Sequence, residues 1–174
     1  MNGKPKLRPK LDSLPELVGR YEYASEVDLF LLKPQIVKRG YMTKKELHEV
    51  ALWKSPRSAG HILKNSDRFI EEITGFALYA TDERSHIEIL CVLNGVSWPT
   101  ASVILHHFHN DPYPIIDFRA LYSLSLDVPS SYTFQFWWDY VVCCRELALK
   151  TSMSMRELDQ ALWQYSKENQ EPNN

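Results

Sequence analysis

The 174-residue chain is poor in cysteine and glycine and has no long apolar run. Its three cysteines, Cys91, Cys143 and Cys144, cannot build a disulfide framework, so reduced thiols are expected. Every uncharged apolar stretch is shorter than the roughly 18 residues that a membrane-spanning helix needs, so no membrane partner is expected. The N-terminus has no apolar signal region, which predicts a cytoplasmic protein.

Strong net charge is also absent, because the formal value is −2. The charges are unevenly spread, however. Residues 1–68 hold 14 Lys and Arg against 8 Asp and Glu, whereas residues 69–174 hold 6 against 14. A basic first half is suited to contacts with phosphates, although a charge run of this kind is as often a solvated surface.

Apolar residues recur at helical spacing through most of the chain, and no stretch alternates as a strand does. The predicted fold class is therefore all-α, a compact helical domain. We expect a single helical domain over residues 13–168. A basic flexible arm (1–12) precedes it and a polar tail (169–174) follows it.

Short local patterns predict where helices begin and end. Capping boxes are expected at 43–46 and 154–157, and Asp82 and Asp117 stand at favoured N-cap positions. Pro34 predicts that a helix over about 24–39 is broken or restarts there, because proline removes a backbone hydrogen bond.

Residues 83–108 predict two short helices joined by a tight turn of about four residues, Asn94 to Ser97. Gly95 permits the left-handed backbone that such a turn requires. Pro99 fits the first turn of the second helix. Because the N–H groups at the head of that helix point outward together, the sequence predicts an anion site for one backbone phosphate.

The turn and the residues after it carry a family pattern. The pattern is Leu93-x-Gly95-Val96-x-x-x-Thr100-Ala101, followed by Ile115-Ile116-Asp117. It resembles the helix-hairpin-helix DNA glycosylases, the superfamily of endonuclease III and the adenine glycosylases. In that superfamily an essential Asp follows the hairpin at a fixed interval, and here Asp117 follows Gly95 by 22 residues. The resemblance is sharp over residues 90–122 and only general in the flanking helices.

The resemblance implies that Asp117 is the catalytic residue. Cleavage of a base–sugar bond passes through an oxocarbenium-like sugar, which a fixed carboxylate stabilises. Asp117 would also orient or deprotonate the attacking water. The alternative is that Asp117 only caps the helix that follows it, and both roles are compatible.

Two positions depart from the family pattern. Pro99 stands where bifunctional members have a lysine, so no Schiff base with the sugar is available and water is the expected nucleophile. Ser97 replaces the second hairpin glycine, which puts the affinity for DNA in question.

Further residues are candidates for contacts with DNA. The expected phosphate contacts come from the turn and from two cations at a helix junction: Gly95, Val96, Ser97, Trp98, Thr100, Lys54 and Arg57. A solvated turn is an equal alternative for Lys54 and Arg57. Aromatic residues around Asp117 are candidates to line a pocket for a flipped base, and the alternative is that they belong to the core. These residues are Trp98, Tyr113, Phe118 and Tyr122.

No cofactor is expected. Several members of the superfamily hold an iron–sulfur cluster on four cysteines near the C-terminus, and this chain lacks that set. His106, His107 and His109 lack the spacing of a metal site. The expected partner is double-stranded DNA, with a monomer as the default oligomeric state.

The sequence thus predicts a monofunctional base-excision-repair glycosylase acting on a modified or mismatched base. The alternative is a non-catalytic DNA-binding or protein-interaction module on the same scaffold. No residue names the base.

Overall fold

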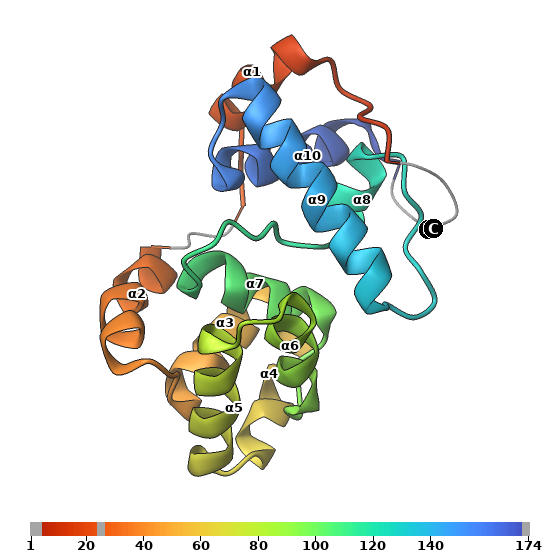
Figure 1. Ribbon diagram of the computed structural model, residues 1–174. Helices are drawn as coiled ribbons and strands as arrows, with labels where there is room; N and C mark the ends of the chain where they lie inside the picture. The colour runs from red at the N-terminus through yellow and green to blue at the C-terminus, as the bar shows by residue number, and fades with distance from the viewer. Residues whose placement is uncertain (1–4, 24–26, 172–174) are drawn as a thin grey trace. The chain divides into compact units, whose positions relative to one another are not determined.

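The computed structural model describes residues 5–23 and 27–171, and within these ranges all regular structure is helical, with no β-strand. The all-α prediction is confirmed at this level. The helices form two units, each described by itself: a central unit of residues 24–111 and a terminal unit of residues 1–23 and 112–174 (Figure 1). A single domain over 13–168 stays a prediction. No helix in the described ranges has the length and apolar character needed to cross a membrane.

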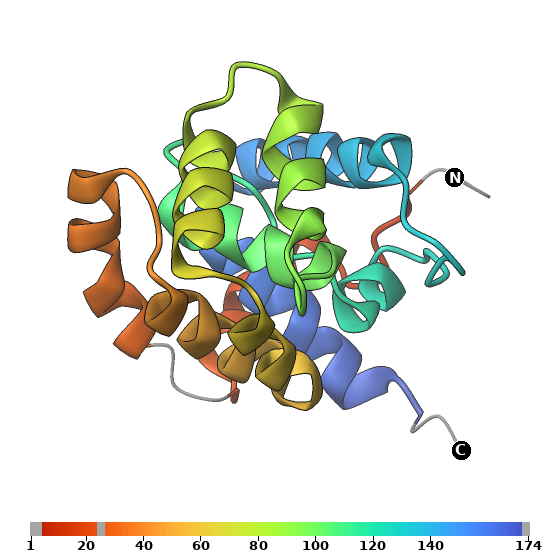
Figure 2. The same ribbon diagram turned by 90° about the horizontal axis from the view of Figure 1, so that it is seen from below.

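The central unit is built around α7. Its helices are α2 (Val27–Arg39), α3 (Lys44–Lys54), α4 (Pro56–Ala59), α5 (Asp67–Tyr79), α6 (Glu83–Glu88) and α7 (Trp98–Phe108), with 3₁₀ turns η2 (Gly60–Lys64) and η3 (Ile89–Val92). Helix α7 packs against α2, α3 and α6, and its residues 101–105 are fully buried. Helices α5 and α6 lie side by side (Figure 2).

Helix starts agree with the local sequence patterns. The Thr43 side chain accepts a hydrogen bond from the Glu46 N–H, and the Glu46 carboxylate accepts one from the Thr43 N–H. The box at Ser154 and Glu157 has the same two bonds. These caps could be predicted because each depends on residues within one helical turn.

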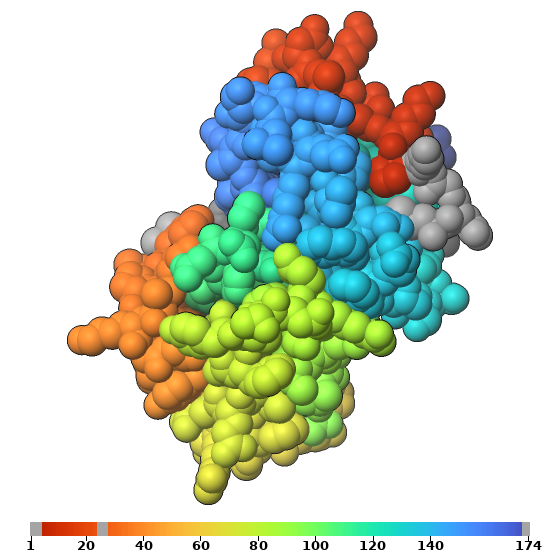
Figure 3. Space-filling model, viewed as in Figure 1, coloured from red at the N-terminus to blue at the C-terminus, as the bar shows by residue number. Residues whose placement is uncertain are grey.

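The expected break at Pro34 is wrong, because α2 runs without interruption from Val27 to Arg39. Leu29 and Ile36 are buried on either side of the proline. The burial of these two side chains holds both halves of α2 against the rest of the central unit. The free energy of this burial offsets the loss of the one backbone hydrogen bond that proline removes. The rest of α2 lies at the surface of the unit, where Leu31 is 68 % exposed (Figure 3).

The terminal unit combines both ends of the chain. It contains a 3₁₀ turn η1 (Leu11–Ser13), α1 (Leu14–Gly19), α8 (Phe118–Ser123), α9 (Phe134–Thr151) and α10 (Met155–Asn169). Helix α10 packs against α1, α8 and α9. The buried Tyr140 hydroxyl donates a hydrogen bond to the Ile115 carbonyl at 2.8 Å. This bond attaches the irregular segment before α8 to the long helix α9.

The predicted basic arm and the predicted polar tail both make contacts with the terminal unit. The Lys6 N–H donates to the Leu124 carbonyl and the Arg8 N–H to the Ser123 carbonyl, each at 2.8 Å. In the tail, Asn169 is the last residue of α10, and its carbonyl accepts a hydrogen bond from the Tyr122 hydroxyl at 3.0 Å. Just before the tail, two hydrogen bonds from Arg20 lower the pKa of Glu168 to about 2. Residues 1–4 of the arm and 172–174 of the tail lie outside the described residues.

Candidate functional site

A tight turn links η3 to α7 in the central unit. Gly95 has φ +86°, in the left-handed region, and the Val96 N–H donates to the Leu93 carbonyl at 3.1 Å. Ser97 is the N-cap residue of α7, and Pro99 lies in the first turn. In the described residues the Ser97 side chain makes no capping bond, so the serine leaves the head of the helix without a side-chain acceptor of its own.

The turn packs directly against the α4–η2 segment. A Cβ atom at Gly95 would lie 2.9 Å from the Ile62 nitrogen and 3.1 Å from the Ser58 carbonyl oxygen. Both neighbours are backbone atoms, which cannot swing away as a side chain can. Glycine is therefore required here for its backbone conformation and for close approach of the two segments.

Asn65 is a functional candidate that sequence reasoning missed. Its side chain accepts a hydrogen bond from the Asn94 N–H at 2.9 Å and donates to the Asn94 carbonyl at 3.0 Å. It also donates to the Ile62 carbonyl at 2.9 Å, and the residue is only 4 % exposed. The side chain thus holds the turn to the end of η2. Local sequence gives no signal for this role, since Asn65 and Asn94 are 29 residues apart.

Replacing Asn65 with alanine should lower the free energy of unfolding by about 1–3 kcal/mol, because it leaves the Asn94 N–H and carbonyl without their side-chain partner. The measurement is urea denaturation followed by circular dichroism. Asn169→Ala is the control, because Asn169 is exposed and its side chain contacts only the Tyr165 carbonyl among the described residues. The two variants should differ clearly. Equal stability would contradict the proposed positioning role of Asn65.

The predicted phosphate-binding residues fall into two groups. Val96 and Thr100 have buried side chains, so only their backbone atoms are candidates for contact with DNA. Ser97 and Arg57 are exposed, and Lys54 is half-buried at the end of α3. Burial thus divides the candidates into backbone and side-chain contributors.

Asp117 caps α8 in the terminal unit. Its Oδ1 accepts hydrogen bonds from the Arg119 N–H at 3.0 Å and the Ala120 N–H at 2.9 Å. The side chain is half-buried. Burial and the nearby Asp117 charge together raise the pKa of Tyr132 to about 12. Asp117 is therefore a rigidly oriented carboxylate at a helix start.

The four predicted pocket aromatics differ in their surroundings. Tyr113 is fully buried and stacks on Trp137, with centroids 5.6 Å apart, so it belongs to the core. The Tyr122 hydroxyl donates to the Asn169 carbonyl, and the Arg8 guanidinium lies 4.3 Å from its ring. Phe118 is 48 % exposed. Trp98 is half-buried in the central unit.

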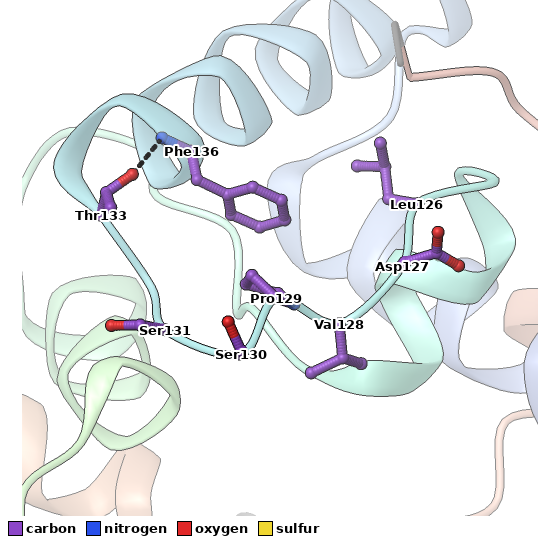
Figure 4. Close-up of a pocket in the computed structure, with 8 residues that line it drawn as sticks. All are labelled: Leu126, Asp127, Val128, Pro129, Ser130, Ser131, Thr133 and Phe136. Atoms are coloured by element: carbon purple, nitrogen blue, oxygen red, sulfur yellow. Dashed lines mark hydrogen bonds between the residues drawn. The ribbon is translucent and has the colours of Figure 1, made fainter. Parts of the chain in front are cut away.

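A cavity of about 400 Å³ lies at the connection from α8 to α9 in the terminal unit (Figure 4). Its lining is Leu126, Asp127, Val128, Pro129, Ser130, Ser131, Thr133 and Phe136. The Phe136 ring meets the Tyr132 ring edge-on at 5.8 Å. None of the four predicted pocket aromatics lines the cavity.

In the described ranges, no three His, Cys, Asp or Glu side chains are placed to share a metal ion. Burial raises the pKa of Cys91 to about 12, so its thiol stays protonated at neutral pH. The His107 ring packs against Phe30 and Trp53, with centroid distances of 5.6 and 5.9 Å.

Comparison of the chain with protein-family models, with curated proteins and with solved structures found no match.

Proposed function

We propose that this chain is a monofunctional DNA glycosylase of the helix-hairpin-helix superfamily, acting on a modified or mismatched base in duplex DNA. The observation that carries the proposal is the pairing of two features at the family interval. One is the glycine turn at the head of α7, and the other is Asp117 at the start of α8, 22 residues after Gly95.

The turn would bind one backbone phosphate. The first N–H groups of a helix have no acceptor within it, and the helix dipole adds positive partial charge there. In α7 this set is smaller by one, because Pro99 has no N–H. The constrained Gly95 backbone and the Asn65 hydrogen bonds fix the turn before any ligand arrives. A preformed turn of this kind is suited to an anion, because little conformational entropy is lost on binding.

Asp117 would stabilise the positive charge that develops on the sugar. As the bond from the base nitrogen to C1′ breaks, the bonding electrons leave with the base and the sugar becomes oxocarbenium-like. A water oxygen then bonds to C1′, and its proton passes to Asp117 and on to solvent. The hydrogen bonds from Arg119 and Ala120 hold the carboxylate in place, which reduces the reorganisation needed in the transition state.

Pro99 determines the expected product. Proline has no primary amine, so it forms no Schiff base with the sugar, and the strand-cleaving route through that position is closed. The product would be an abasic site in an intact strand.

A second candidate is a non-catalytic module that binds DNA or protein through the same scaffold. The capping bonds of Asp117 favour it, because they give the carboxylate a structural role that needs no catalysis. Ser97 in place of a glycine points the same way, since it alters the phosphate-binding turn.

A panel of labelled duplexes separates the two candidates. The duplexes carry deaminated, alkylated or oxidised bases, and each is scored for strand breakage before and after alkali. A monofunctional glycosylase gives breaks only after alkali, because alkali cleaves the abasic site. Breaks before alkali, trapped by borohydride, would show that another amine acts as nucleophile and would contradict the monofunctional assignment.

A further inference from the structure

The α4–η2 segment, against which the turn packs, also presents an exposed basic face. Arg57, His61 and Lys64 are spaced by four and three residues, which places them on one side of this continuous helical segment, and all three are exposed. The opposite side is buried through Ala59 and Ile62. We call the three exposed residues the basic ridge.

The ridge and the turn belong to two stretches without acidic residues. Residues 50–66 and residues 89–110 contain no Asp or Glu, although the whole chain has 22. These two stretches meet where Gly95 approaches Ser58 and Ile62. Among the described residues, neither Arg57 nor Lys64 forms an ion pair. The two stretches together carry Lys54, Arg57 and Lys64 and no carboxylate, so they are locally positive in a chain whose net charge is −2.

We propose that the basic ridge is a second phosphate-binding surface for duplex DNA, on the same segment that the turn packs against. This proposal rests on the proposed binding of duplex DNA by the turn. The turn would hold one phosphate through backbone N–H groups, and Arg57 and Lys64 would neutralise neighbouring phosphates of the duplex. Asn65 joins the two parts, since it follows Lys64 directly and its side chain bonds to Asn94.

The contacts are with the backbone, so the ridge is a surface for positioning rather than for reading sequence. Its contribution should be electrostatic and should fall as salt is added. Each phosphate that is neutralised contributes about 0.9 to the slope of log affinity against log salt.

The test is the affinity of the full chain for an unmodified, fluorescein-labelled DNA duplex, measured by anisotropy at several salt concentrations. Arg57→Gln and Lys64→Gln should each weaken binding about three- to tenfold and lower the salt slope by about one. Lys38→Gln is the matched control, because it removes the same charge elsewhere in the central unit. Lys38 lies near the C-terminal end of α5, because the Tyr79 hydroxyl at that end contacts the carbonyl of Val37 at 3.5 Å. Lys64 precedes the N-terminal end of α5.

The control should bind within about twofold of wild type. Equal affinities for Arg57→Gln, Lys64→Gln and Lys38→Gln would overturn the proposal that the ridge binds phosphates. Tighter binding of an RNA duplex, with the same dependence on Arg57 and Lys64, would overturn the assignment to DNA.

Because the duplex carries no lesion, this result is independent of catalysis. If binding depends on the ridge but no base is released from any lesion, the proposed glycosylase activity is contradicted and phosphate binding by the ridge is supported. Base release that is unaffected by the ridge variants, together with unchanged affinity, would contradict the ridge alone.

Discussion

Replacing Gly95 with alanine should lower the free energy of unfolding by about 2–5 kcal/mol. A left-handed backbone costs a non-glycine residue about 1–2 kcal/mol. The new Cβ would also lie 2.9 Å from the Ile62 nitrogen and 3.0 Å from Ile62 Cδ1, and overpacking of this kind adds about 1–3 kcal/mol. The measurement is urea denaturation followed by far-ultraviolet circular dichroism.

Gly60→Ala is the matched control for Gly95→Ala. Gly60 lies in the α4–η2 segment that the turn packs against, but it is exposed, its φ is −59°, and a Cβ there would meet nothing within 4 Å. Alanine should be neutral or stabilise by up to about 1 kcal/mol at Gly60, since it reduces the freedom of the unfolded chain. Similar stability of the two variants would contradict the close packing of the turn against Ser58 and Ile62.

The same Gly95→Ala variant should also bind duplex DNA more weakly. A displaced turn no longer presents the first-turn N–H groups of α7 in their original arrangement. Binding is compared at a temperature where circular dichroism shows both proteins folded. Wild-type affinity in the folded variant would contradict phosphate binding by the turn.

Asp117→Asn should reduce base release by about a hundredfold or more while the fold remains. Asparagine caps helices about as well as aspartate, so α8 keeps its hydrogen bonds from Arg119 and Ala120. What the variant loses is the negative charge that would stabilise the oxocarbenium-like sugar. Duplex affinity should change little, because the role proposed for the carboxylate is at the sugar and not at the phosphates.

Asp82→Asn is the matched control for Asp117→Asn. Asp82 caps α6 and accepts a hydrogen bond from the Ser85 N–H at 2.9 Å. The substitution therefore makes the same chemical change at another helix N-cap. Base release by Asp82→Asn should equal that of wild type. A comparable loss in both variants would mean that capping, and not catalysis, explains the effect at Asp117.

The sequence predicted the features that depend on neighbouring residues. The capping box at Thr43 and Glu46 and the N-cap at Asp117 were found because side chain and backbone partner lie within one helical turn. The prediction of a helix break at Pro34 is wrong because it depends on residues that are not neighbours in the sequence. Burial of Leu29 and Ile36 against the rest of the central unit decides whether α2 continues, and local propensity does not contain that information.

The candidate site shows the same division. The turn at Gly95 could be predicted from the residue types alone, since a left-handed backbone favours glycine. The partners of the turn, Asn65 and the α4–η2 segment, come from about 30 residues earlier in the chain, and no local pattern links them. Likewise, spacing around Asp117 marked Tyr113 as a pocket candidate, but packing against Trp137 places it in the core.

The most direct test of the account is single-turnover base release by wild type and by Asp117→Asn on the same lesion-containing duplexes, developed with alkali. We expect wild type to release a base from at least one duplex. Asp117→Asn, folded and bound to the same duplex, should release the base more slowly by about a hundredfold or more. Equal rates for the two proteins, or no release from any duplex by folded, DNA-bound wild type, would contradict catalysis by Asp117.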